Sequence, residues 1–177
     1  YAYSFYREPP KDIKLDPHVK VMYVFNDNQL WYCSQKRREA VLSELKEWKK
    51  SVGTLYFYTH PEGMGNLALP SMHKNGIKML FSDLSQAGVS GISMNNSEPF
   101  DGTALDNYLY LKMAWNPNSD IDKIYGDALA KCYGEKAAPF VMKYFELVEE
   151  HTSRYSEKID FDLSMGSAKR YPRTLDY

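Results

Sequence analysis

TLYFYT, residues 54–59, is the stretch that decides the fold, because it is rich in β-branched and aromatic residues and too short for an independent helix. Before it, residues 34–52 carry apolar side chains such as Leu45 and Trp48 at helical spacing, with charged residues between them. After it, residues 72–86 predict a second helix. A short strand between two amphipathic helices is typical of an α/β unit with parallel strands.

Three more segments extend this strand and helix alternation in both directions. KVMYVF at residues 20–25 and VSGISM at residues 89–94 predict strands, and so does YAYSFY at residues 1–6. We therefore expect about four parallel strands joined by crossover connections. Residues 7–19 are short and proline-rich for a crossover, so an antiparallel pairing of the first two strands stays open.

The second half of the chain predicts helices only. Their expected bounds are residues 105–115, 120–133 and 135–155. Asp120 is a suitable N-cap for the second of these helices, and Gly134 follows its end. The strand-containing part is thus followed by a helical part.

Composition excludes several classes of function. The chain has 22 Lys and Arg against 23 Asp and Glu, so its charge offers no attraction to nucleic acid, and no apolar run is long enough to insert into a membrane. The usual nucleotide, zinc-protease and esterase motifs are missing from the sequence, and its two cysteines lack metal-site spacing. We expect no cofactor and no metal. An aromatic content of 15% suits a cleft lined with rings.

One pattern in the helical part resembles a known family. The pattern consists of Leu105, Tyr108, Lys112, Trp115, Pro117, Asp120 and the pair Tyr133-Gly134. It is similar to the end of a barrel domain in a bacterial family named only as a domain of unknown function and often linked with polysaccharide utilisation. Residues 1–10, 38–48 and 88–91 also resemble that family.

The resemblance implies the C-terminal half of a TIM-type (β/α) barrel, similar to the glycoside hydrolase barrels of hexosaminidases and α-glucuronidases. Residues 1–115 would form the partial barrel, 116–155 a helical extension packed on it, and 156–177 an irregular tail. An N-terminal half or a second copy of the chain would complete the barrel. Carbohydrate is the implied ligand, and an extracytoplasmic location is favoured.

Candidate site residues follow from the rule that barrel enzymes place their chemistry at the carboxyl ends of the strands. Glycoside hydrolysis needs two carboxyl groups beside the scissile bond, and sugar rings stack on aromatic side chains. The predicted catalytic residues are Glu8, Asp27 and Glu98. The predicted substrate-binding residues are Tyr6, Trp31, Tyr58, His60, Asn95 and Asn96. Each also has a plain structural explanation, as a turn, loop or surface residue.

The leading hypothesis is therefore a glycoside-hydrolase-like protein, and its rival is a non-catalytic carbohydrate-binding or scaffolding domain. The rival is favoured by the Asn95-Asn96 pair, which stands where the resemblance implies an acidic residue.

Other large side chains are assigned to packing. Tyr3, Tyr23 and Tyr56 are expected to fill the barrel interior, and Trp48 and Trp115 to lie in the core. His73 and His151 are assigned no role, because neither has a partner at ligand spacing.

Overall fold

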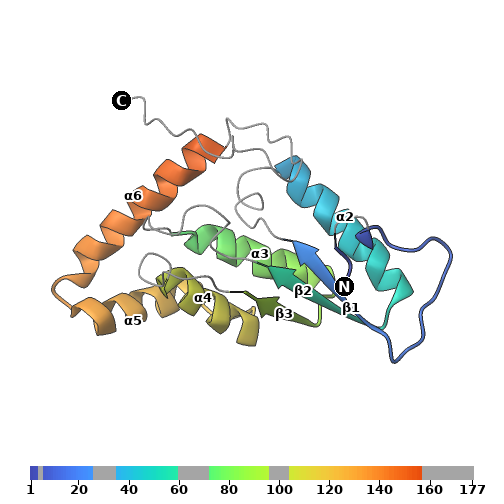
Figure 1. The fold of residues 1–177 in the computed structure, drawn as a ribbon. Helices are drawn as coiled ribbons and strands as arrows, with labels where there is room; N and C mark the ends of the chain where they lie inside the picture. The colour runs from blue at the N-terminus through green and yellow to red at the C-terminus, as the bar shows by residue number, and fades with distance from the viewer. Residues whose placement is uncertain (4–5, 26–34, 60–71, 96–103, 157–177) are drawn as a thin grey trace.

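The computed structural model describes residues 1–3, 6–25, 35–59, 72–95 and 104–156 of the 177-residue chain (Figure 1). Within these ranges the fold is α/β. Its first part alternates strands and helices, in the order β1 (Lys20–Phe25), α2 (Gln35–Ser51), β2 (Thr54–Thr59), α3 (Lys74–Gln86) and β3 (Gly91–Met94). Its second part is helical, with α4 (Ala104–Trp115), α5 (Ile121–Tyr133) and α6 (Ala138–Ser156).

The three strands form one parallel sheet in the order β1-β2-β3. Ala2 adds a parallel bridge to Tyr23 on the outer side of β1, where its backbone N–H donates to the Met22 carbonyl at 2.8 Å. The pairing left open by the sequence is therefore parallel. In the described residues, the expected strand over residues 1–6 is reduced to this one bridge. The Tyr6 backbone N–H donates to the Tyr3 carbonyl at 3.0 Å, which forms a turn.

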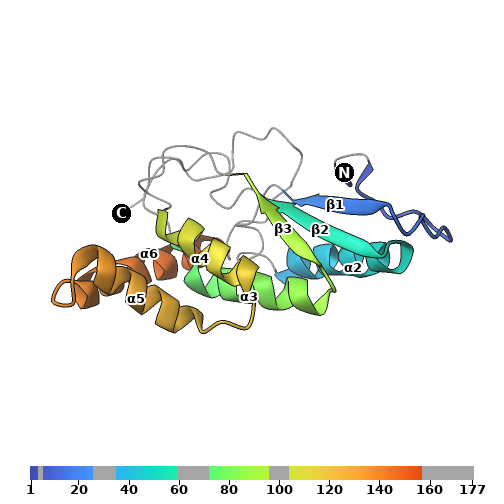
Figure 2. The same ribbon diagram turned by 90° about the horizontal axis from the view of Figure 1, so that it is seen from below.

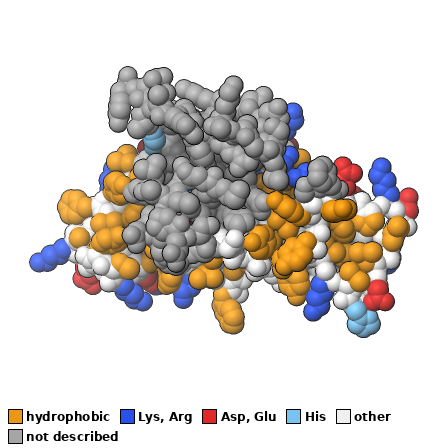
Figure 3. Space-filling view, in the orientation of Figure 1, with side chains coloured by type: hydrophobic (Ala, Val, Ile, Leu, Met, Phe, Trp, Pro, Cys, Tyr) orange, Lys and Arg blue, Asp and Glu red, His pale blue; other side chains and the backbone are white. Residues whose placement is uncertain are grey.

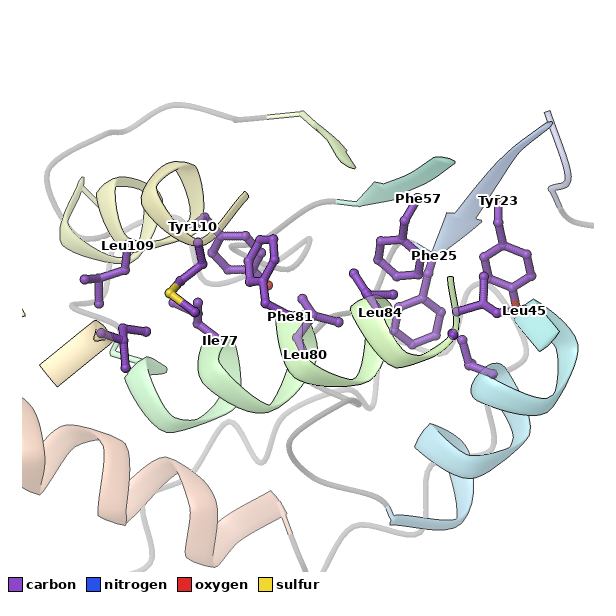
Figure 4. Packing of buried hydrophobic residues seen from close by; sticks show 14 of the residues in the cluster. Tyr23, Phe25, Leu45, Phe57, Ile77, Leu80, Phe81, Leu84, Leu109 and Tyr110 are labelled. Carbon is purple, nitrogen blue, oxygen red and sulfur yellow. The ribbon is translucent and has the colours of Figure 1, made fainter. Parts of the chain in front are cut away.

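The main core lies between one face of the sheet and helices α2 and α3, which cover the same side of the sheet (Figure 2). Side chains alternate along β2: Leu55, Phe57 and Thr59 are buried, whereas Tyr56 and Tyr58 are half-buried on the other face. Phe57 stands at the centre of an aromatic row, with the rings of Tyr23 and Phe25 both 6.1 Å from its own (Figure 4). Burying each such side chain contributes about 1.5–3 kcal/mol to stability.

The tyrosines expected inside a barrel do not share one environment. Tyr23 is fully buried on the helix-covered face, where its hydroxyl donates to Glu44 of α2 at 2.6 Å. Tyr56 is half-buried on the opposite face, and Tyr3 is 38% exposed. The expectation for Tyr23 is wrong because strand alternation places it with Val21 and Phe25, toward α2.

The helical part packs along α3 rather than on the sheet alone. Phe81 of α3 meets Tyr110 of α4 edge to face, with ring centroids 5.5 Å apart, and Ile77 lies near Leu109 (Figure 4). The predicted N-cap is confirmed, because the Asp120 carboxylate accepts from the Lys123 backbone N–H at 3.0 Å. The described helices include none with the length and hydropathy to cross a membrane.

One core assignment is confirmed and one is wrong. Trp48 is 7% exposed and its indole N–H donates to the Arg7 carbonyl at 2.7 Å. Trp115 is 91% exposed, because α4 buries its Leu109, Tyr110 and Met113 side and turns its last residue outward. Apolar spacing alone did not reveal which side of this helix meets α3.

Candidate functional site

The carboxyl ends of the three strands lie level at one edge of the sheet. The register pairs Phe25 with Thr59 and Thr59 with Met94, which are the last residues of β1, β2 and β3. Asn95 continues the ladder by donating its backbone N–H to the Thr59 carbonyl at 2.9 Å. In parallel α/β folds this edge is where ligands bind.

Two predicted substrate-binding residues are described at this edge. Tyr58 is half-buried on the face away from the helices, opposite Val24 and Ser93 in the register. Asn95 is exposed and comes next after the last residue of β3. A phenol ring and a primary amide at one sheet edge can supply a stacking surface and hydrogen bonds to hydroxyl groups.

Tyr56 shares with Tyr58 the sheet face opposite α2 and α3, but lies two residues farther from the carboxyl edge. Its ring packs over Gly91, where an added Cβ would stand 3.1 Å from the Tyr56 Cδ1 atom. Glycine at position 91 thus lets the ring lie flat against β3. The position of Tyr56 is explained by packing within the sheet.

The predicted site residues of the N-terminal segment, Tyr6 and Glu8, precede β1 in the chain. Tyr6 is 81% exposed and Glu8 is exposed. Between them, Arg7 is held against α2 by an ion pair from its Nε to Glu44 Oε2 at 2.8 Å. Glu44 also accepts from the Tyr23 hydroxyl, and burial together with this carboxylate raises the pKa of Tyr23. This cluster of Arg7, Glu44 and Tyr23 anchors the segment to α2.

The other predicted residues lie outside the described residues: Asp27, Trp31, His60, Asn96 and Glu98. In sequence they belong to the segments that join β1 to α2, β2 to α3 and β3 to α4. The described part of the sheet edge carries no carboxylate, since its residues are Phe25, Thr59, Met94 and Asn95. Any acid catalysis at this edge therefore depends on the joining segments.

A buried histidine–aspartate pair that the sequence did not predict joins α3 to α4. The Nδ1 atom of His73 lies 2.8 Å from Asp106 Oδ2, and the His73 backbone N–H donates to Asp106 Oδ1 at 2.9 Å. The two side chains are only 7% and 6% exposed. Burial lowers the pKa of His73, but the charge and hydrogen bond of Asp106 and the charge of Glu149 outweigh it, so the pKa is raised.

Glu149 of α6 accepts hydrogen bonds from the first turn of α3. Its carboxylate accepts from the Asn75 backbone N–H at 2.7 Å and from the Asn75 side-chain amide at 3.0 Å. Burial raises the pKa of Glu149, with Asn75 and His73 acting against it. Carboxylates are favourable at a helix N-terminus because of its exposed N–H groups and dipole, so Asp106 and Glu149 replace a local cap.

This three-helix junction, defined by His73, Asn75, Asp106 and Glu149, left no local signal in the sequence. His73 and Asp106 are 33 residues apart, and Asn75 and Glu149 are 74 apart. The structure begins α3 at Lys74, and His73 before it makes no side-chain cap hydrogen bond.

Comparison with known families identifies the chain at the level of family. The profile of the family described as "Domain of unknown function (DUF4838)" matches residues 1–146. The chain belongs to this family. No curated protein and no solved structure matches it.

The DUF4838 match includes the whole described sheet edge and the His73–Asp106 pair, whereas Glu149 lies beyond its end. The family description assigns no reaction. No group of three or more His, Cys, Asp or Glu in the described part of this DUF4838 chain is arranged to hold a metal ion.

Proposed function

We propose that this DUF4838 chain binds an oligosaccharide or polysaccharide at the carboxyl edge of its sheet, as part of a glycoside-hydrolase-like (β/α) barrel. The single observation that carries the proposal is the level parallel register, which brings the ends of β1, β2 and β3 to one edge. Tyr58 and Asn95 occupy this edge. The segments that follow it in sequence carry Asp27, His60 and Glu98.

The proposed roles follow from side-chain chemistry. The Tyr58 ring stacks on the apolar face of a sugar, and the Asn95 amide bonds a hydroxyl group. Asp27 and Glu98 are the carboxyl groups proposed for general acid and base or nucleophile, because they follow strand ends that lie in one sheet. Glu8 is a third carboxylate proposed for the reaction. It follows Arg7, which is ion-paired with Glu44 of α2.

A non-catalytic carbohydrate-binding function is the second candidate. It is favoured by the absence of carboxylates among the described edge residues and by the exposed amide of Asn95. Amides bind sugar hydroxyl groups but do not transfer protons at neutral pH. The two candidates share a ligand and differ only in turnover.

The test is a screen of the full-length protein against aryl glycosides and oligosaccharide fragments, followed by calorimetry on any ligand found. Tyr58→Ala should weaken binding by up to about tenfold, the contribution of one aromatic stacking contact. Tyr56→Ala is the matched control, because it removes a tyrosine from the same face but away from the edge. Equal losses in both variants, or a protein that binds no glycan, would contradict the proposal.

Variants of the carboxylates distinguish the two candidates. In a hydrolase, Asp27→Asn or Glu98→Gln should lower kcat by at least about a hundredfold while sugar affinity stays near that of the wild type. Glu8→Gln is measured beside them. Binding without turnover in every form assigns the chain to carbohydrate recognition alone.

A further inference from the structure

Helix α6 is held to the rest of the molecule in two different ways along its length. Its first half is packed by apolar side chains, which are those of Ala138, Val141, Met142 and Phe145. Met142 approaches α5 closely, since a Cβ added at Gly126 would lie 3.8 Å from its Cε atom. Hydrophobic side chains are visible at this end of the molecule in the space-filling view (Figure 3). Apolar packing therefore anchors the first half.

The second half of α6, from Glu146 onward, meets α3 through a carboxylate. Glu149 accepts from the Asn75 backbone N–H at 2.7 Å and from the Asn75 side-chain amide at 3.0 Å. Leu147 is 52% exposed, and Glu150 is exposed. Among its described side chains, this half contributes none to the buried apolar cluster. The described link of the second half to α3 is therefore polar.

The Glu149 carboxylate shares the three-helix junction with a second carboxylate, that of Asp106 on α4. Burial lowers the pKa of His73, but the charges of Asp106 and Glu149 outweigh it. Burial raises the pKa of Glu149, and Asp106 adds to this rise whereas the His73 charge opposes it. The protonated histidine thus attracts two carboxylates that repel each other and that come from two different helices.

Other titratable groups also act on the junction from the helices around it. In the described residues they are Lys74 of α3, Tyr125 of α5 and Glu146 of α6. Lys74 forms an ion pair with Asp122 of α5, and its Nζ atom lies 5.5 Å from the Tyr125 ring centroid. Burial raises the pKa of Tyr125, so the phenol stays neutral. His73 is therefore the cation of this group that titrates nearest to neutral pH.

We propose that the second half of α6 is a pH-sensitive latch, docked on α3 while His73 carries a proton and released when that proton is lost to solvent. The neutral ring still donates from Nδ1 to Asp106, so α3 and α4 stay linked. The junction loses only the positive charge, and its two carboxylates then repel each other where little water reaches them. Asp106 is buried between packed helices whereas Glu149 is half-buried, so α6 is the part that moves.

The direction of the effect follows from linkage between proton binding and docking. The pKa of His73 and that of Glu149 are both raised in the docked structure. Each group therefore stabilises docking fully below its ordinary pKa, and this contribution is lost as the pH rises through the raised pKa. Rising pH releases the second half of α6, and falling pH docks it again.

Distances between two spin labels test the proposal. The labels are placed on Leu147→Cys of α6 and Ser85→Cys of α3, both exposed positions, in a chain that also carries Cys33→Ser and Cys132→Ser. From about pH 5.5 to about pH 9.5, a range that contains the titration of a histidine with a raised pKa, a second, longer distance should grow in population by at least about tenfold. The control pair Ser85→Cys with Phe140→Cys reports the first half of α6, and its distance should not change.

Three variants identify the groups involved. Glu149→Gln keeps a carbonyl acceptor for Asn75 but removes the charge, so α6 should stay docked at every pH. Glu150→Gln is the matched control, because it removes an exposed charge from the next position of α6 and should leave the release as in the wild type. His73→Gln should show no change of distance with pH, because the titrating ring is gone.

Four results would each overturn the proposal. The first is a wild-type distance that is the same at every pH, and the second is an equal change in the control pair. The third is release that persists in Glu149→Gln, and the fourth is a pH dependence that persists in His73→Gln.

Discussion

Two clusters of charged side chains hold distant parts of this chain together, and they differ in burial. The three-helix junction joins α3 to α4 and α6 through the His73–Asp106 pair, whose side chains are 7% and 6% exposed. The cluster of Arg7, Glu44 and Tyr23 joins the N-terminal segment to α2, with its ion-paired side chains 28% and 25% exposed. Ion pairs of similar geometry therefore differ in how much stability is lost when one partner is removed. The loss is large for a buried pair and small for a pair that water reaches.

In the junction, neither the His73 ring nor the Asp106 carboxylate is exposed enough to regain water if its partner is removed. Each carboxylate there also satisfies backbone N–H groups at the start of α3. In the Arg7 cluster, the ion-paired side chains are about a quarter exposed, so their charges are partly solvated, whereas Tyr23 is buried. The junction should therefore dominate stability, and the Arg7 cluster should contribute less.

The largest effect is expected for Asp106→Ala. It leaves the buried His73 ring and its backbone N–H without their acceptor, so the free energy of unfolding should fall by about 3 kcal/mol, as for other broken buried pairs. Urea unfolding followed by circular dichroism measures it. The control is Asp122→Ala on α5, whose side chain is 54% exposed and pairs with Lys74 and Lys78. Equal losses in the two variants would show that burial does not set the difference.

A smaller loss is expected for Glu44→Ala in the Arg7 cluster. The Tyr23 hydroxyl would lose its acceptor inside the core, so the free energy of unfolding should fall by about 1–2 kcal/mol. In the Tyr23→Phe background the same substitution should cost less, because the buried hydroxyl is gone. A loss as large as that of Asp106→Ala would reverse the ranking of the two clusters.

The pH dependence of stability sharpens the comparison. The pKa of His73 is raised above its ordinary value of 6.5 in the folded chain. Its contribution is therefore fully present below pH 6.5 and is lost as the pH rises through the folded pKa. The free energy of unfolding of the wild type should decrease over that window, and His73→Gln should remove this decrease.

His18 provides the control for this titration. It also contacts an aspartate, Asp16, at 2.9 Å, but its side chain is 96% exposed. His18→Gln is measured beside His73→Gln as the variant of an exposed histidine. If His18→Gln flattens the profile and His73→Gln does not, the assignment of the titration to the buried pair is wrong.

The smallest effect is expected for the exposed pair of Lys123 and Asp127 on α5. Their atoms are 2.6 Å apart, but the side chains are 70% and 54% exposed. Asp127→Asn should leave the denaturation midpoint unchanged within error at physiological salt, because screening and side-chain entropy offset the attraction. A clear loss would show that surface pairs matter in this chain.

The sequence predicted the elements of the fold well where a local pattern defines them. The strands at residues 20–25 and 54–59 have the expected bounds, and the Asp120 cap is confirmed. These features depend on side-chain periodicity and on hydrogen bonds within one turn, which neighbouring residues decide. In the described residues the expected four strands are three strands and one bridge, which pairs Ala2 with Tyr23 of β1.

The candidate site was predicted in part. The sequence placed Tyr58 and Asn95 after or near strand ends, and the register brings them to one edge. The functions of these residues, and those of Asp27 and Glu98, stay predictions. The burial of Trp115 was wrongly predicted, since spacing shows that a helix has apolar sides but not which side is covered.

By itself, then, the sequence determined the order of strands and helices, the parallel sheet and the family pattern that ends at Tyr133-Gly134. Only the tertiary structure decided how α3 begins, because its capping carboxylates come from Asp106 and Glu149 on other helices. It also decided that Phe140, Tyr144 and Leu147 of α6 are exposed. Both depend on contacts between residues far apart in the chain, which local periodicity cannot encode.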